Sequence, residues 1–268
     1  MKFKTTMVAL GIATAISGSA QAGSIYLTGH DVLFHGGQNN YDGKILNYLR
    51  GAGTTSEIAA GSYNIGLVRG FSGGVSTGDF SAFGTTTTRD LTSFTSAADF
   101  SSFLSGVDVL VIPSHTSCGG CDLSTADANI LEGFSSQITS FFNAGGDIYA
   151  NSGARDTTFY NFLPPSAVAS GTSIGGSTGF TATAAGLGIG IANNNINGFP
   201  THNKFSSFDP AFTVFETRGT ETISIGIRDA SIGGGGIITG GGSTVPEPGT
   251  IALLGLGALG LARSRKKA

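Results

Sequence analysis

The feature that most constrains the fold is a strand, helix, strand unit in the middle of the chain. Residues 107–112 form an almost continuous run of valine, leucine and isoleucine, typical of a strand covered on both faces in a parallel sheet. Ser124 and Asp127 have the spacing of a helix-capping pair, and apolar residues then recur on one helical face. Glycines at 145–146 end this pattern before a second short strand at residues 147–151. The unit therefore predicts parallel strands joined by a helix.

Short apolar runs and helical periodicity predict further elements on both sides of this unit. Strands are predicted at residues 24–28, 64–68, 188–191, 212–216 and 222–227, and helices at residues 41–49 and 96–106. Residues 70–95 are rich in Ser, Thr and Gly, which indicates a long loop or an insertion with short edge strands. We therefore expect an α/β fold of three layers, with a mostly parallel sheet and additional β strands in the C-terminal half.

Composition limits the classes of partner. Residues 23–245 contain eight basic and sixteen acidic residues, which gives this region a formal net charge of −8. An acidic region without a basic patch argues against nucleic acid as a partner. Charged residues make up only 12% of the whole chain, and 44 of its 268 residues are glycine. This composition suits a secreted protein with many loops.

The N-terminus has the three parts of a secretory signal peptide. Two lysines precede an apolar stretch at residues 7–16, and small residues then occupy both positions that a signal peptidase reads. We expect signal peptidase to be a partner and to cut the chain between Ala22 and Gly23.

The C-terminus also has three parts in a fixed order. The sequence Pro246-Glu247-Pro248 is followed by an apolar stretch at residues 249–262 and by four basic residues. As a helix of ~1.5 Å per residue the stretch would cover ~21 Å, short of the ~30 Å hydrocarbon core of a bilayer. It would anchor the chain in the inner membrane only transiently, with the basic residues on the cytoplasmic side.

This tail resembles the PEP-CTERM sorting signal. In that family an exosortase, a membrane-embedded cysteine protease-transpeptidase, reads the tail, and Pro246, Glu247 and Pro248 match its recognition motif. The resemblance implies an exosortase as a partner, a final location at the cell surface or outside the cell, and exopolysaccharide as a further partner. It does not specify the activity of the rest of the chain.

The two terminal signals divide the chain into four parts. We expect a signal peptide at residues 1–22, one extracellular α/β domain at 23–238, a Gly-rich linker at 239–245 and the sorting signal at 246–268. The second part is long enough for one domain with a substantial core.

Cys118 and Cys121 are the two cysteines of the sequence, and Gly-Gly separates them. In an exported protein they are expected to form a disulfide that clips a local loop. A redox-active pair is the alternative, because thioredoxin-type motifs have the same spacing. The Trp and Pro that accompany such motifs are absent here, which favours the structural disulfide.

The unit from residue 107 to residue 154 resembles the core of class I glutamine amidotransferase-like domains, which have a flavodoxin-like sheet. In that family the turn after the second strand is a nucleophile elbow with a cysteine between glycines. The sequence Ala150-Asn151-Ser152-Gly153-Ala154 occupies this turn, so thiolate chemistry is excluded at that position.

Polar residues follow several predicted strands at their carboxyl ends, where ligands bind in parallel α/β sheets. They are His30, Asp31, Ser114, His115, Asn151 and Ser152, and Thr201, His202 and Asn203 form a further polar group. Three roles remain open for them.

One hypothesis makes Ser152 a nucleophile, with His202 or His115 as its base and Asp31 as an orienting group. A second makes four residues ligands of a divalent cation, namely His30, Asp31, His115 and His202. The third, which we favour, is that these residues hydrogen-bond the ends of the strands. The sequence thus predicts an exported protein with a non-catalytic structural or binding role and no cofactor; the alternative is an extracellular serine hydrolase.

Overall fold

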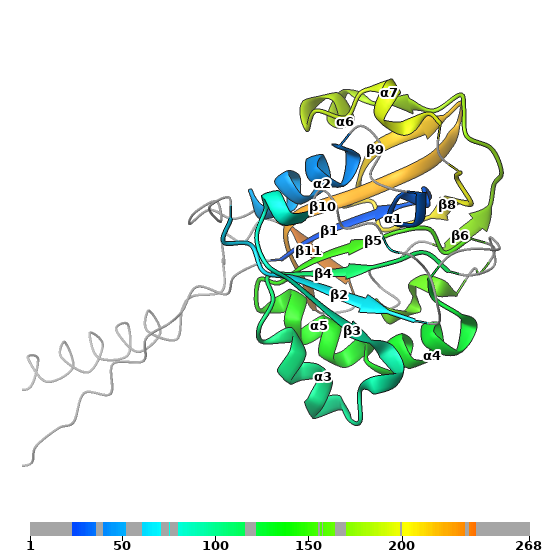
Figure 1. Cartoon of the computed structure of the whole chain (residues 1–268). Coiled ribbons are helices and arrows are strands. Elements are labelled where there is room, and N and C mark those ends of the chain that lie inside the picture. The colour runs from blue at the N-terminus through cyan, green and yellow to red at the C-terminus, as the bar shows by residue number, and fades with distance from the viewer. Residues whose placement is uncertain are drawn as a thin grey trace, which may run out of the picture. The chain divides into compact units, whose positions relative to one another are not determined.

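The computed structural model describes eleven stretches of the chain, all within one compact unit at residues 20–241 (Figure 1). They are residues 23–35, 40–51, 61–70, 75, 80–115, 122–154, 156, 158–163, 170–198, 200–233 and 236–239. The predicted signal peptide, the C-terminal tail and the predicted disulfide of Cys118 and Cys121 lie outside the described residues. Within these stretches, each helix is too short or too polar to cross a membrane.

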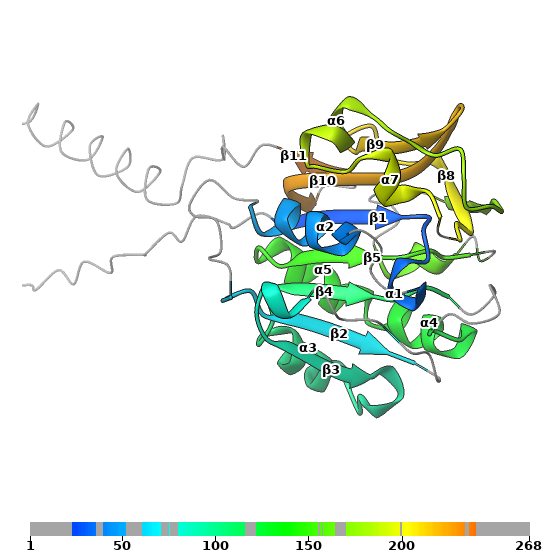
Figure 2. The ribbon, with the colours of Figure 1, turned by 45° about the horizontal axis from the view of Figure 1, so that its top comes forward.

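The described strands form one mixed sheet, whose main path runs β3-β2-β4-β5-β1-β10-β8-β6 (Figure 2). The strands are β1 (Gly23–Thr28), β2 (Ile65–Arg69), β3 (Thr86–Asp90), β4 (Val109–Ile112), β5 (Asp147–Ala150), β6 (Ser170–Ser173), β7 (Thr181–Ala182), β8 (Asn203–Ser207), β9 (Thr213–Arg218), β10 (Glu221–Gly233) and β11 (Gly236–Thr239). The first five are mutually parallel, while β10 joins β1 in antiparallel fashion and begins the antiparallel part. The predicted α/β class, with parallel strands first and additional strands in the C-terminal half, is confirmed, and the structure shows that the additional strands are antiparallel.

Helices cover both faces of the sheet and give the structure three layers (Figure 1). The α-helices are α1 (Val32–His35), α2 (Tyr41–Arg50), α3 (Ala97–Leu104), α4 (Thr125–Gly133), α5 (Ser135–Asn143), α6 (Ala184–Gly188) and α7 (Asn193–Ile196), and the 3-10 helices are η2 (Phe80–Ala82), η3 (Leu91–Ser93) and η5 (Phe159–Phe162). Helices α3, α4 and α5 lie on one face, and α1, α2, α6 and α7 lie on the other.

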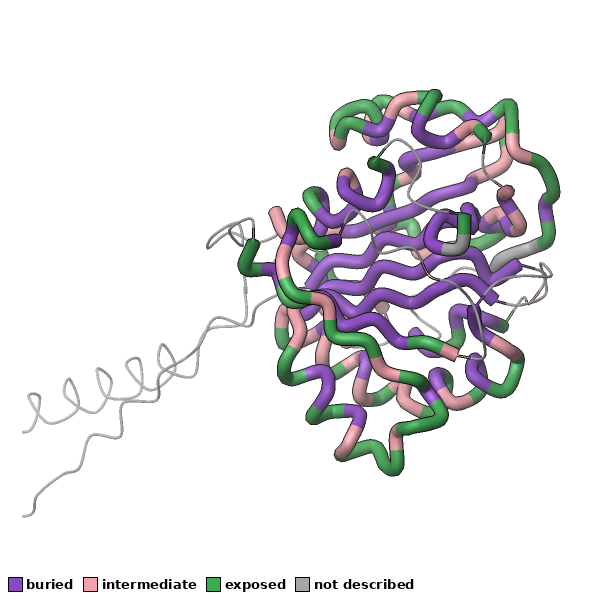
Figure 3. Tube along the Cα trace, viewed as in Figure 1, coloured by how far each residue is buried: buried purple, intermediate pink, exposed green. Residues whose placement is uncertain are grey.

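The central strands are buried on both faces because each contributes to two hydrophobic cores (Figure 3). In β4, Leu110 and Ile112 belong to the core beneath α3, α4 and α5, whereas Val109 and Val111 belong to the core beneath α2. The alternation follows from the two-residue period of a strand. It explains why this strand has the continuous apolar sequence expected of a parallel sheet.

Two predicted elements differ in the structure. The single helix expected after Ser124 is divided into α4 and α5. Its capping box is present, but Gly133 weakens the helix and Phe134 leaves helical geometry to stack on the ring of Phe100, with centroids 4.4 Å apart. The strand expected at residues 188–191 is wrong, because Thr183 caps α6, which ends at Gly188, and a turn follows.

The first strand of the chain does not occupy the place that the first strand has in a flavodoxin-like sheet. In the flavodoxin-like order 2-1-3-4-5 the first strand would be second. Here β1 lies between β5 and β10, and Ile25 pairs with Ile148 on one side and Ile227 on the other. The order β3-β2-β4-β5 nevertheless matches the flavodoxin-like order for its first four strands, and β1 occupies the fifth place.

Candidate functional site

The carboxyl ends of β4, β5 and β1 are joined by backbone hydrogen bonds that continue beyond the strands. The amide of His115 donates to the carbonyl of Ser152 at 2.9 Å, and the amide of Ser152 donates to the carbonyl of His30 at 3.2 Å. The polar residues that follow the three strands are therefore brought to one edge of the sheet, as the sequence predicted.

The segment before β8 reaches the same edge through close contact with the end of β1. The amide of His202 donates to the carbonyl of Gly29 at 2.9 Å, and the amide of Asp31 donates to the carbonyl of Pro200 at 3.0 Å. A Cβ atom on Gly29 would lie only 1.8 Å from the carbonyl oxygen of Asn203. Glycine is thus required for this approach, which places His202 next to Asp31.

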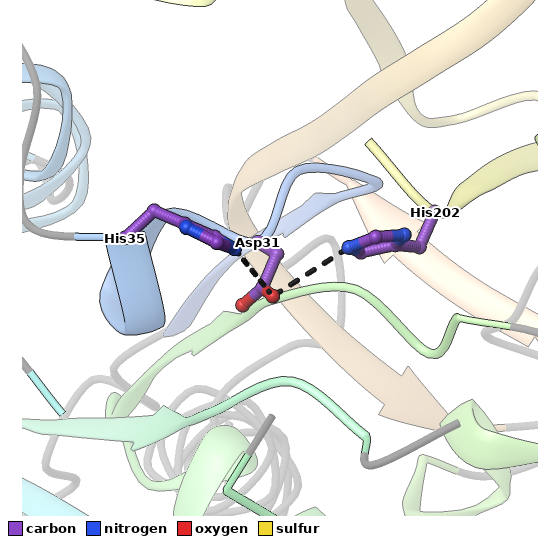
Figure 4. Close-up of side chains that lie close together, drawn as sticks. All are labelled: Asp31, His35 and His202. Atoms are coloured by element: carbon purple, nitrogen blue, oxygen red, sulfur yellow. Dashed lines mark ion pairs between the residues drawn. The ribbon is translucent and has the colours of Figure 1, made fainter. Parts of the chain in front are cut away.

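Asp31, His35 and His202 form one cluster at this edge (Figure 4). The Oδ2 atom of Asp31 lies 3.4 Å from Nε2 of His35 and 3.6 Å from Nε2 of His202. The Asp31 side chain is 1% exposed, whereas those of His35 and His202 are 34% and 24% exposed. The cluster therefore has a buried carboxylate beneath two imidazoles that solvent reaches.

Ser152 is held in a different arrangement from the predicted nucleophile. Its buried hydroxyl donates to Oδ1 of Asn203 at 2.8 Å and accepts from the amide of Ala154 at 3.0 Å. Among the described residues, these are its side-chain partners, and neither is a histidine. The left-handed backbone of this turn is at Ala154, where φ is 52°, and not at Ser152. The structure thus brings His202 to Asp31 but pairs Ser152 with Asn203.

His115 belongs to a separate group at the start of α4. Its Nε2 atom lies 3.3 Å from Oγ1 of Thr125 and 3.6 Å from Oδ2 of Asp156. Burial lowers the pKa of His115, and the neighbouring Asp156 carboxylate offsets only part of this effect.

His30 lies in a buried polar network on the α2 face of the sheet. Its Nδ1 atom is 2.7 Å from Oγ1 of Thr201, and its Nε2 atom is 2.7 Å from Oε2 of Glu216. The other oxygen of Glu216 accepts hydrogen bonds from the hydroxyls of Tyr26 and Tyr41. Burial, followed by the Glu216 carboxylate, raises the pKa of both tyrosines well above the usual value. Both ring nitrogens of His30 are therefore engaged within the core.

Three further side chains at this edge contain buried polar atoms without a hydrogen-bond partner in the described structure. They are the amide nitrogen and oxygen of Asn151, the hydroxyl of Ser114 and the amide nitrogen of Asn203. All three residues are at most 1% exposed. In proteins such atoms are normally satisfied by ordered water or by a ligand.

Sequence reasoning missed two residues of this region, His35 and Glu216. His35 follows Asp31 by four residues, which places both side chains on one face of a helical turn. This Asp-x-x-x-His spacing could have identified it. Glu216 gave no comparable signal, because its partners come from β1 and α2, far away in the sequence.

A surface hollow of about 240 Å³ lies between α3 and α5, with Leu104 and Phe141 in its lining. A neighbouring hollow of about 270 Å³ includes Asp108 and Gly146, at the amino ends of β4 and β5. Both are thus at the opposite end of the strands from the polar edge.

Comparison with known proteins identifies the C-terminal tail. The PEP-CTERM protein-sorting motif matches residues 244–266. This motif implies processing by an exosortase, export and sorting to the cell surface. No curated protein and no solved structure matches the chain.

Proposed function

We propose that this exported, exosortase-sorted protein has a non-catalytic binding role in the exopolysaccharide matrix. Its binding site is the carboxyl edge of the sheet, around Asn151, Ser114 and Asn203. The observation that carries this proposal is that these three residues contain buried polar atoms for which the described part of the chain offers no hydrogen-bond partner.

The chemistry of these atoms suits a carbohydrate. A buried polar group without a partner costs roughly 1–3 kcal/mol, so a ligand that supplies hydrogen bonds gains affinity there. Because the three residues are at most 1% exposed, the proposal requires the edge to open when the ligand binds. Asn151 offers an amide oxygen and nitrogen, Asn203 an amide nitrogen and Ser114 a hydroxyl, which together donate to and accept from sugar hydroxyls. Because residues 23–245 have a formal net charge of −8, a neutral polysaccharide is favoured over a polyanion.

The finer aspects of the fold and of export are part of the same proposal. We infer that β3-β2-β4-β5 corresponds to the first four strands of a flavodoxin-like or amidotransferase-like sheet, on the basis of strand order. The signal peptide cut after Ala22, the Cys118–Cys121 disulfide and the transient membrane anchor stay predictions from the sequence.

A serine hydrolase is the weaker candidate. It requires a base next to the Ser152 hydroxyl, but that hydroxyl donates to an amide oxygen of Asn203. We expect Ser152→Ala to leave any esterase or glycosidase signal of the purified chain unchanged.

The test is Asn151→Leu in the full chain, with binding and stability measured together. Leucine has a similar size and needs no hydrogen bond. In the absence of ligand, the free energy of unfolding of this variant should therefore be about 1 kcal/mol higher than that of the wild type. It should also bind a neutral polysaccharide fraction from the matrix of the producing cells at least about tenfold more weakly, since about 1.4 kcal/mol corresponds to tenfold in affinity.

The matched control is Asn64→Leu, at the opposite end of the strands, where the asparagine is exposed. It should bind the polysaccharide like the wild type. Equal binding by the wild type and Asn151→Leu would contradict the proposal and would assign these polar atoms to ordered water.

A further inference from the structure

We propose that Asp31, His35 and His202 form a binding site for one divalent transition-metal ion of the zinc type. The site is distinct from the polysaccharide site and does not depend on it. The observation is that one ligand atom from each residue lies within 4.8 Å of the other two. Asp31 directly precedes α1, His35 is the last residue of α1, and His202 directly precedes β8 (Figure 4).

The distances fit coordination by a small ion. Tetrahedral zinc with ligands at about 2.0–2.1 Å has ligand atoms about 3.3–3.4 Å apart. The Asp31 oxygen is 3.4 Å from Nε2 of His35 and 3.6 Å from Nε2 of His202. The two imidazole nitrogens are at most 4.8 Å apart, so a small rotation of either exposed ring completes the site.

The backbone holds the ligands in place before any ion binds. Asp31 and His35 are one helical turn apart, which directs both side chains to the same side. His202 is fixed by the two backbone hydrogen bonds that join its segment to Gly29 and Asp31, and by the bridge between His30 and Thr201. Preorganised ligands reduce the conformational entropy that binding must overcome.

Burial leaves one side of the cluster open. The carboxylate of Asp31 is 1% exposed, and the two imidazoles are about one quarter to one third exposed. A bound ion would therefore keep a position for water, as in sites with three protein ligands.

The donor set selects the class of ion. Two imidazole nitrogens favour zinc, copper, nickel or iron, whereas calcium and magnesium prefer oxygen donors. The set also differs from the one suggested by sequence, because His30 is engaged with Glu216 and Thr201 and His115 lies beside Thr125 and Asp156.

The experiment is a zinc titration of the full chain. The protein is purified through an affinity tag that contains no histidine, and a chelator removes any bound metal before the titration. The wild type should bind one zinc ion per chain in competition with a chromophoric chelator, and cobalt in its place should give visible d–d absorption. His35→Gln and His202→Gln should each weaken zinc binding at least about 100-fold, because even outer-shell substitutions cost 10–100-fold. Both side chains are partly exposed, so these variants should fold, which their thermal melts would verify.

His115→Gln is the matched control and should bind zinc like the wild type. Asn151→Leu should also retain zinc, which separates this site from the polysaccharide site. The proposal would be overturned if folded His35→Gln and His202→Gln bound zinc as well as the wild type, or if His115→Gln lost as much affinity as they do. Wild-type protein that bound no zinc would overturn it as well.

Discussion

Asp147 provides the most quantitative prediction, because its carboxyl group is buried at the start of β5. The side chain is 5% exposed; one oxygen accepts from the hydroxyl of Tyr63 at 2.7 Å and the other from the amide of Ser24 at 2.8 Å. Burial raises its pKa from 3.8 to about 7, although both hydrogen bonds act in the opposite direction. The perturbation is Asp147→Asn, which removes the ionisable group but keeps its shape.

The sign follows from proton binding. Between pH ~4 and pH ~7 the folded protein keeps a proton on Asp147 that the unfolded chain releases, so stability falls as pH rises through this window. A shift of about three pKa units corresponds to a loss of about 4 kcal/mol in the free energy of unfolding. This loss is complete above pH ~7 and absent below pH ~4. The asparagine should accept from Ser24 and donate to the hydroxyl of Tyr63, which can reverse its role.

We therefore expect Asp147→Asn to be up to about 4 kcal/mol more stable than the wild type at pH 8 and nearly equal to it at pH 4. Denaturant unfolding of both proteins at pH 4, 6 and 8 measures this difference. The control is Asp90→Asn, whose carboxylate is 51% exposed and should show no such trend. A variant that is less stable at pH 8, or a difference that does not grow with pH, would refute the reasoning.

Two further substitutions test the edge and the core. Gly29→Ala should destabilise the protein by about 3 kcal/mol and weaken zinc binding, because the new methyl group collides with the backbone of Asn203; Gly133→Ala, where a Cβ meets nothing within 4 Å, should not. Glu216→Leu should lower the free energy of unfolding by about 3–5 kcal/mol, because Tyr26, Tyr41 and His30 lose the carboxylate that they contact. A smaller loss in denaturant unfolding would argue against a cooperative network.

Local signals allowed much of the fold to be predicted. The caps at Ser96 and Ser124 depend on residues three positions away, and both accept the predicted hydrogen bond from the backbone. The place of β1 could not be predicted in this way, because it depends on pairing with β5 and β10, which are far along the chain. Likewise, glycine and isoleucine alternate near Gly190 as in a strand, but that glycine has a left-handed backbone after a helix.

The candidate site shows the same division. The rule that parallel strands end at one edge identifies Asp31, whereas His202 comes from the separate polar group at residues 201–203; their contact is observed. Ser152 looked equally suitable because its position resembles a nucleophile elbow. Its real partner, Asn203, lies at the first residue of an antiparallel strand whose register no local pattern specifies.

The position of β1 also determines the order in which the fold can be completed. This strand is synthesised before all the others, yet its neighbours are β5 and the much later β10. Contacts between distant parts of a chain form slowly, because a long loop must close first. One edge of β1 can pair with β5, but the other edge stays unpaired until β10 has been made, which exposes it to misassembly during export. We infer that folding of the domain finishes only when nearly all of it has reached the outer side of the membrane.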